Sequence, residues 1–365
     1  MLTSFEIKNF RTFSHLRIER LGRVNLIVGK NNVGKTTLLE ALQLYGSIRP
    51  PSTVGSMLDE RNEILPTPEG KTLLLLQSLF HGRHPRKGDA VRIGPLNGEK
   101  ALAFIATAKI EPEQASQSGQ AALSMQSAGI HYTLYPTRNW TCSTWSDAWE
   151  LPKPPFDPPF LRSVGAQYDV AARIATWWDA LSLNKAESGV VRALEVIAPR
   201  PIQDIRLIGD PRSDGGRIAI VDIEGHDERL AMATLGGGVV RMFQIAVALE
   251  YAAVYAKAAS RADSAFAHIL PLLLIDEVET GIHHALHADL WRFVFHAARQ
   301  LNVQVFAATH SWDCLKGFAQ AVFEDEQNDG LAIRLERDPD EEATRAVVID
   351  REKLPIVARD TIEVR

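Results

Sequence analysis

The sequence predicts an α/β protein in which buried strands alternate with helices. An apolar run of β-forming residues at 23–28 stops at a glycine and is followed by a helical pattern over 35–45. The last third repeats this order, with apolar strands between amphipathic helices, which favours a parallel sheet. Residues 2–10 and 15–19 instead alternate apolar and polar side chains, as solvent-facing strands do.

Composition places the chain among soluble globular proteins with a sizeable core, since 45% of its 365 residues are hydrophobic and 23% are charged. A formal net charge of −5 excludes a globally basic nucleic-acid coat and leaves a local basic groove open. Cys142 and Cys314 lie too far apart in sequence to suggest a disulfide framework. The longest uninterrupted apolar stretch, 269–275, is far too short to span a bilayer. We therefore expect a cytoplasmic protein without membrane contact.

The remaining elements follow from periodicity and turn composition. Residues 49–70 are rich in Pro, Gly, Ser and Thr, which predicts a loop or mobile insertion. Residues 102–110 and 130–134 read as two strands of a hairpin, with a polar tip between them. Helices are expected at 171–197, 239–257 and 285–301, and further strands at 202–208, 218–223, 270–275, 303–308, 331–335 and 346–349.

A complete G-x-x-x-x-G-K-[ST] motif lies between the strand at 23–28 and the helix at 35–45. Its two glycines allow the backbone to curl so that successive N–H groups point at phosphate oxygens. The lysine supplies a charge to the β- and γ-phosphates of a nucleotide, and the threonine hydroxyl is a ligand for Mg²⁺. The predicted ATP-binding residues are Gly29, Asn31, Asn32, Val33, Gly34, Lys35, Thr36 and Thr37.

A second element is the apolar strand at 270–275, which ends in Asp276 and Glu277. A carboxylate at the end of a buried strand can reach the Mg²⁺ shell beside Thr36, and we assign Asp276 to that position. Glu277 is then placed to polarise the attacking water. His310 follows the next predicted strand, and we expect it to contact the γ-phosphate.

A glycine cluster at Leu235, Gly236, Gly237 and Gly238 directly precedes the helix at 239–257. Glycines at a helix N-terminus form an anion-binding nest. Because one triphosphate needs only one such nest, a second nest predicts that two protomers sandwich the nucleotide.

The order of phosphate loop, glycine signature, acidic strand end and histidine resembles the ABC-type ATPases of the RecF/SMC branch, and most closely the stand-alone OLD-like AAA ATPases. Residues 7–13, 276–283 and 304–311 carry this resemblance, and Phe80 and residues 362–365 add to it. The resemblance implies a P-loop NTPase of ABC-ATPase head type, with a mixed sheet, flanking helices, an antiparallel β-lobe and a helical subdomain. It implies one head over 1–365, with a nucleotide-binding core at 1–48 and about 200–365 and an inserted part at about 49–199.

The resemblance further implies ATP and Mg²⁺ as cofactors, a homodimer that closes on ATP, and Gly236–Gly238 acting on the nucleotide of the partner. Arg11 matches an N-terminal arginine of the branch and is expected to reach a phosphate. The usual signature serine is replaced by Gly236, and the Mg²⁺-sensing glutamine has two candidates, Gln77 and Gln167. Because no heptad pattern separates Lys35 from Asp276 and few residues follow His310, we expect neither the long coiled coil of SMC proteins nor the nuclease domain of OLD nucleases in this chain.

The resulting hypothesis is an ATPase that hydrolyses ATP to gate DNA or a separate effector, such as a nuclease or toxin, in phage defence. A RecF-like DNA repair ATPase and a non-hydrolysing scaffold that restrains a partner protein are the alternatives.

Overall fold

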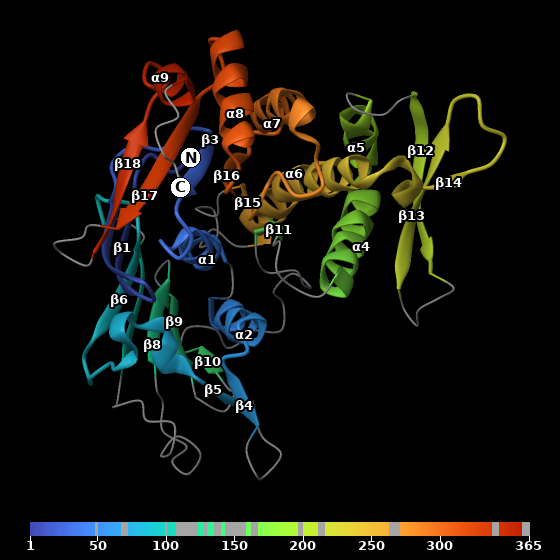
Figure 1. The fold of residues 1–365 in the computed structure, drawn as a ribbon. Helices are drawn as coiled ribbons and strands as arrows, with labels where there is room; N and C mark the ends of the chain where they lie inside the picture. Colours follow the sequence, from blue (N-terminus) through green and yellow to red (C-terminus); the bar gives the residue numbers. More distant parts are fainter. Residues whose placement is uncertain are drawn as a thin grey trace.

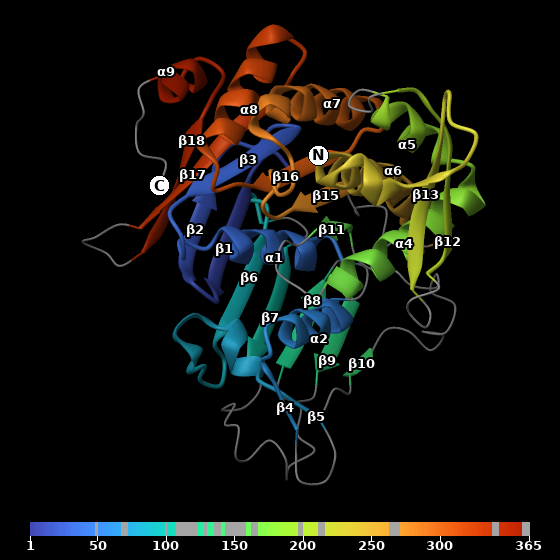
Figure 2. The same ribbon diagram turned by 45° about the vertical axis from the view of Figure 1, so that its right-hand side comes forward.

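The computed structural model describes residues 1–47, 50–66, 72–98, 101–106, 123–127, 130–134, 140–142, 158–161, 167–195, 200–210, 216–262, 271–337 and 343–359. Two regions used above lie outside these residues: most of the expected hairpin tip and the C-terminal stretch 362–365. The described elements form two large sheets with helices around them (Figures 1 and 2).

The sheet that positions the phosphate loop has six strands in the order β11-β15-β16-β3-β17-β18. All neighbours are parallel except the pair β17 and β18. The strands are β3 (Val24–Gly29), β11 (Phe160–Leu161), β15 (Leu272–Ile275), β16 (Gln304–Ala308), β17 (Gly330–Arg337) and β18 (Thr344–Ile349). Every residue of β3, β15 and β16 is buried, which explains their mostly apolar sequences.

Helices cover both faces of this sheet (Figure 2). Helix α1 (Lys35–Tyr45) lies on one face, and α7 (His287–Gln300) and α8 (Trp312–Glu324) lie on the other. The bounds of α1 agree with the sequence prediction. Helix α8 was not anticipated from the sequence, although its buried face is apolar and Ser311 caps its N-terminus by accepting a bond from the N–H of Cys314 (3.2 Å).

The second sheet is antiparallel, in the order β10-β9-β8-β7-β6-β1-β2. Its strands are β1 (Phe5–Phe10), β2 (Phe13–Ile18), β6 (Ala90–Gly94), β7 (Leu102–Ala106), β8 (Leu123–Ser127), β9 (Ile130–Leu134) and β10 (Trp140–Cys142). The expected antiparallel lobe is therefore present. Both sheets cross the predicted domain boundaries, because β1 and β2 join the antiparallel sheet while β11 joins the parallel one.

The helical part contains α4 (Gln167–Asn184), α5 (Glu187–Leu194) and the long helix α6 (Gly237–Ala262). A three-stranded sheet of β12 (Ile202–Gly209), β13 (Arg217–Ile223) and β14 (Leu230–Ala231) lies beyond α4 and α5 (Figure 1). Trp177 of α4 stacks on Tyr251 of α6 with ring centroids 5.5 Å apart. The mixed α/β class with an antiparallel lobe and a helical part is thus confirmed.

The prediction of a loop over 49–70 was wrong, because this segment contains helix α2 (Pro50–Glu60). Its two prolines stand at the helix start, where a missing N–H is tolerated, and Val54, Met57 and Leu58 form the buried face. The other short elements are β4 (Ile64–Pro66), β5 (Thr72–Leu74), α9 (Leu354–Arg359) and the 3-10 helices η1 (Leu76–Leu79), η2 (His81–Arg83), η3 (Met232–Leu235) and η5 (His284–Leu286).

One described helix segment, Gly237–Ala258, is long and apolar enough to cross a membrane, with a mean hydropathy of 1.4. Of that stretch, 67% is buried inside the fold, where α4 and α5 pack against it. Its apolar character is therefore accounted for by a core position. The sequence pattern shows the same helix, but its apolar residues are interrupted by Arg241, Gln244 and Glu250.

Candidate nucleotide site

The phosphate loop links the carboxyl end of β3 to the N-terminus of α1. Gly29 (φ +147°), Asn32 (φ +63°) and Gly34 (φ +102°) adopt positive φ angles, so the backbone turns back on itself. A Cβ on Gly34 would lie 2.6 Å from the Phe13 ring, so this position also requires glycine for space. The side chain of Val33 lies against Gly29 on the buried side of the loop.

Lys35 lies across the loop that will receive the phosphates. Its Nζ donates to the backbone carbonyl oxygens of Gly29 (2.7 Å) and Lys30 (2.8 Å). Burial lowers the pKa of Lys35 to about 8, and the nearby carboxylates of Asp276, Glu279 and Glu277 oppose this shift. The lysine is thus a buried cation satisfied by carbonyl groups of its own loop, which phosphate oxygens can replace.

Thr36 and Asp276 meet at the ends of two different elements. The Thr36 hydroxyl donates to Oδ2 of Asp276 at 2.9 Å, across 240 residues of sequence. Asp276 follows β15 and is 8% exposed, and its N–H donates to the carbonyl of Leu161 in β11 (2.8 Å). This pair of oxygen ligands matches the donors that Mg²⁺ prefers.

Glu277 and His310 face the same cavity as the phosphate loop. Glu277 is half-buried and adopts φ +47°, which is uncommon for a residue other than glycine. Its Oε2 accepts a long hydrogen bond from the Thr280 hydroxyl (3.4 Å). His310 is exposed, and its backbone N–H donates to Oε1 of Glu279 (3.0 Å).

The cavity formed by these groups has a volume of about 560 Å³. Its polar lining places the phosphate loop opposite the acidic strand end and the histidine. The lining residues are Thr12, Asn31, Asn32, Gly34, Lys35, Thr36, Thr37, Arg61, Glu277 and His310. The parallel strands β15, β16 and β3 bring these segments together, because their carboxyl ends lie at one edge of the sheet.

Arg11 does not line this cavity, contrary to the expectation that it reaches a phosphate. Its side chain is 4% exposed, with Nε 3.1 Å from Oε2 of Glu40 and Nη1 2.8 Å from Oε2 of Glu63. Glu40 belongs to α1 and is fully buried. The arginine thus lies inside an ion-pair cluster under the loop, because the turn between β1 and β2 packs inward against α1.

Arg61 and Thr12 line the cavity and were missed in the sequence. Arg61 follows α2, and its Nε donates to Oε1 of Glu40 at 2.7 Å while its side chain stays 35% exposed. Thr12 lies within the stretch 7–13 that carries the family resemblance, but no role was assigned to it there, and no local motif marks Arg61. Of the two glutamine candidates, Gln77 lies in η1 outside the lining, and Gln167 begins α4 with a side chain that is not described.

The glycine signature lies apart from this cavity. Leu235 ends η3, Gly236 adopts φ +101°, and α6 begins at Gly237. Gly236 and Gly237 are exposed, and none of the signature residues lines the phosphate cavity. The nest formed at the start of this 26-residue helix therefore lies outside the phosphate cavity.

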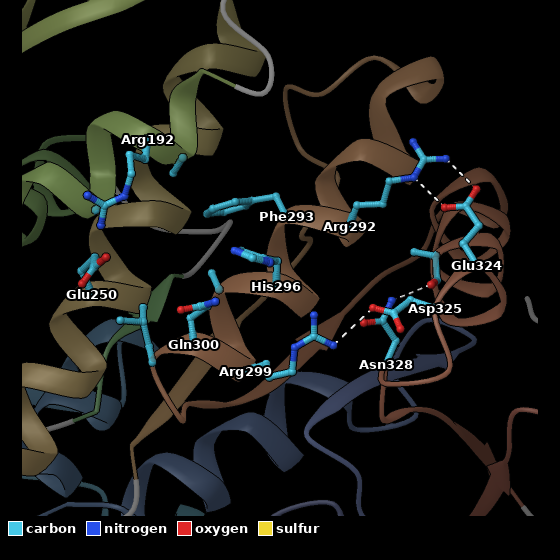
Figure 3. A pocket seen from close by; sticks show the side chains of 15 residues that line it. Arg192, Glu250, Arg292, Phe293, His296, Arg299, Gln300, Glu324, Asp325 and Asn328 are labelled. Atoms are coloured by element: carbon cyan, nitrogen blue, oxygen red, sulfur yellow. Dashed lines mark hydrogen bonds and ion pairs between the residues drawn. The ribbon is translucent and has the colours of Figure 1, made fainter.

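A second cavity, of about 720 Å³, lies between α5, α6, α7 and α8 (Figure 3). Two of the arginines that line this cavity form ion pairs with acidic side chains. Arg292 donates to both carboxylate oxygens of Glu324 (2.6 and 2.7 Å), and Arg299 donates to Asp325 (3.3 Å). This cavity contains none of the predicted nucleotide-binding residues, so its size does not make it the phosphate site.

Comparisons with known proteins relate the chain to ATPase families. Residues 1–47 match the family model described as "AAA ATPase domain", and residues 159–313 match "AAA domain, putative AbiEii toxin, Type IV TA system". An ATP/GTP phosphatase of Helicobacter pylori is 24% identical over 357 residues, which cover 89% of each protein. The DNA replication and repair protein RecF of Clostridioides difficile is 44% identical over 43 residues, or 12% of each protein.

Among solved structures, an Smc head bound to the C-winged helix domain of ScpA covers 97% of this chain and 99% of its own, at 12% identity and a TM-score of 0.49. The Smc head domain of Pyrococcus furiosus, bound to the C-terminal domain of ScpA, covers 99% of both chains at 11% identity and a TM-score of 0.45. The identification therefore rests on the sequence matches and on the assembled loop, acids and histidine. Together they support an ABC-type ATPase of the RecF/SMC-like branch.

Proposed function

We propose that the chain binds ATP with Mg²⁺ in the phosphate cavity, closes a homodimer around it and reopens the dimer by hydrolysis. The observation that carries this proposal is the contact of Thr36 with Asp276 beside Glu277 and His310 in one cavity. Lys35 and the loop amides bind the β- and γ-phosphates, and Arg61 adds a second cation to the same cavity.

Thr36 and Asp276 would hold the Mg²⁺ ion, which suits them because both offer hard oxygen donors and few other protein ligands are needed. The ion supplies charge neutralisation at the β- and γ-phosphates. Glu277 accepts a proton from the attacking water, and His310 contacts the γ-phosphate from the neighbouring strand end.

The dimer is supported by the position of the signature. Gly236 and Gly237 are exposed, Gly238 is half-buried, and none of them lines its own protomer's cavity, so their anion-binding amides are available to a second copy. The hydroxyl of the usual signature serine is missing here, which predicts weaker closure around ATP. In this proposal 1–48 and about 200–365 form the nucleotide-binding core of one head, and about 49–199 form the inserted lobe.

The proposed role is to gate DNA or a separate effector protein in the cytoplasm, in phage defence. The toxin-system wording of the match at 159–313 and the resemblance to OLD-like ATPases support this setting. The similarity to RecF over 43 residues favours the alternative of a DNA repair ATPase. That alternative requires ATP-dependent DNA binding that weakens steeply as salt is raised.

The test of hydrolysis is the variant Glu277→Gln. We expect its turnover to fall by a factor of about 10² to 10⁴, because the general base is lost while the phosphate loop is intact. The variant should retain ATP and form a dimer that size-exclusion chromatography with light scattering detects in ATP but not in ADP. Glu352→Gln, an exposed carboxylate distant in sequence, is the matched control.

A wild-type protein without turnover, measured with and without duplex DNA, would contradict this proposal. The non-hydrolysing scaffold would then be the better reading. Turnover that survives in Glu277→Gln would show that another group activates the water.

A further inference from the structure

Strand β12 is an edge of the three-stranded sheet β12-β13-β14. Within the described part of the chain, its only neighbouring strand is β13, which pairs with it from Ile202 to Gly209. Alternate backbone N–H and C=O groups on the other side of β12, which we call the free edge, therefore have no strand to bond. β12 contains no proline or lysine, the residues that commonly protect such an edge, so its backbone can accept another strand.

A groove of about 710 Å³ runs along this free edge, and six consecutive residues of β12, 203–208, line it. Because the side chains of a strand alternate between the two faces of its sheet, consecutive lining residues indicate that the groove follows the edge and not one face. Its other wall consists of residues of α4 and α5: Trp178, Ser182, Glu187, Ser188, Val191 and Arg192. The groove therefore suits an added strand that is covered by helices on one side.

The free edge lies away from the surfaces that we propose to close on ATP. The three-stranded sheet stands at the end of the molecule remote from β3 and α1 (Figures 1 and 2). Within this sheet β14 is the opposite edge, and the chain continues from β14 through η3 to the signature glycines. None of the groove residues lines the phosphate cavity. A contact at β12 therefore uses a different surface from the nucleotide-dependent contact.

The charges on β12 are complementary to those of a second β12. Asp204 and Arg206 are two residues apart, so they lie on the same face of the strand, and their side chains are 41% and 58% exposed. In an antiparallel pair of β12 strands centred on Ile205, Asp204 of each copy stands opposite Arg206 of the other. Since Nε of Arg206 donates to Asp204 within one chain (2.8 Å), the pairing joins two ion pairs into a network of four charges.

Helix α5 is self-complementary in the same way. Its apolar face is buried, and its other face lines the groove with Glu187, Ser188, Val191 and Arg192. Within the described part of the chain, neither Glu187 nor Arg192 forms an ion pair. A two-fold axis that relates two antiparallel copies of α5 places Glu187 of each copy opposite Arg192 of the other. Both walls of the groove thus carry charges in an order that a two-fold axis matches.

We propose that the free edge of β12 binds a second copy of this chain, strand against strand and antiparallel, so that one sheet continues through both copies. The contact needs no nucleotide and does not rest on the proposed function. An interface of one strand and one short helix lies near the lower limit of stable complexes, about 1,200 Å², so we expect it to form only at about 10 to 100 µM protein. Where ATP also closes a dimer, the two contacts together build a larger assembly.

The test is sedimentation velocity of the nucleotide-free protein between about 1 and 200 µM. We expect the wild type to shift from monomer to dimer as its concentration rises. Asp204→Arg and Arg206→Asp should each weaken the dimer at least about tenfold, because every charge across the paired strands then meets a like charge. An equimolar mixture of the two variants should dimerise at least as well as the wild type, because their strands carry opposite charges.

The matched control is Lys316→Asp. Lys316 lies on α8, its side chain is 49% exposed, and its Nζ is 3.8 Å from Oδ1 of Asp313. Its reversal changes the net charge by the same amount as Arg206→Asp and also removes an exposed ion pair, but it does not touch the groove. Its dimer should therefore match that of the wild type.

A wild type that stays monomeric up to about 200 µM would overturn the proposal and favour a strand of another protein as the occupant of the groove. Dimers of Arg206→Asp as stable as those of the wild type would overturn it too, because another surface would then hold the copies together. A mixture of the two variants that stays monomeric would exclude the pairing centred on Ile205. Since all of these measurements are made without nucleotide, their failure leaves the proposed ATPase function intact.

Discussion

At the centre of the cavity, burial and phosphate binding act in opposite directions on the charge of Lys35. Its pKa falls from 10.5 to about 8 because desolvation disfavours the ammonium form. Since the folded protein binds fewer protons than the unfolded chain between these values, this group makes the unliganded protein more stable as pH rises from about 8 to 10.5. Binding of the negatively charged phosphates nevertheless requires the protonated form of Lys35.

We therefore predict that ATP affinity declines as the pH rises from 7 to 9, by up to about tenfold per unit above the pKa of Lys35. Fluorescent ATP-analogue titration across this range measures it. Lys35→Arg binds more weakly but keeps its charge, so its affinity should show no such decline. An unchanged wild-type affinity from pH 7 to 9 would mean that Lys35 is fully charged throughout.

At the scale of elements, an ion-pair cluster connects the turn between β1 and β2 with α1 and the end of α2. Glu40 of α1 is fully buried between Arg11 and Arg61, and Glu63 accepts from Arg11 and from the Ser78 hydroxyl (2.8 Å each). Burial of these charges is tolerated only because each has a partner. The two arginines differ in one respect: Arg61 reaches the cavity and Arg11 does not.

This difference predicts opposite phenotypes. Arg11→Met should lower the free energy of unfolding by about 3–5 kcal/mol, because it leaves buried carboxylates with fewer partners. Arg61→Met should have a smaller effect on stability and should mainly weaken ATP binding. Urea unfolding and ATP titration on both variants separate these effects. If Arg11→Met instead had normal stability and weakened ATP binding, the result would support the contact between Arg11 and a phosphate that the sequence predicts.

At the scale of the whole molecule, the proposed dimer assigns the phosphate loop and the signature glycines of one chain to different composite sites. Lys35→Ala should inactivate the protein through its loop, and Gly238→Asp should inactivate it by placing a negative charge in the nest. A Cβ on Gly238 lies at an ordinary 3.7 Å from the Gly281 carbonyl oxygen, so this substitution should not disturb folding.

Mixing these two inactive variants should restore turnover, because the mixed dimer contains one site with an intact loop and an intact signature. With free exchange of protomers, the recovered rate is at most about a quarter of the wild-type rate. Steady-state hydrolysis of the mixture against each variant alone measures it. Failure of complementation, with mixed dimers demonstrated, would show that each protomer completes its own site.

Local sequence determined the parts of this protein whose chemistry is contained in a short segment. The glycines and lysine of the phosphate loop, the apolar strands that end in Asp276 and His310, and the bounds of α1 all follow from spacing and burial. Their assembly was also predictable in outline, since parallel strands bring their carboxyl ends to one edge. The helical character of α2 was hidden because its prolines, glycine and serines are typical of loops.

Tertiary structure alone decided which charged residues face the nucleotide and which lie inside the fold. Arg11 and Arg61 are the same residue type, so residue type does not separate their roles. The packing of the turn after β1 buries Arg11, whereas the end of α2 brings Arg61 to the cavity. Arg241 contacts Asp276 and Glu277 only because α6 packs against the end of β15. The two Arg241 contacts span 35 and 36 residues, and no local pattern encodes a pairing set by the shape of the core.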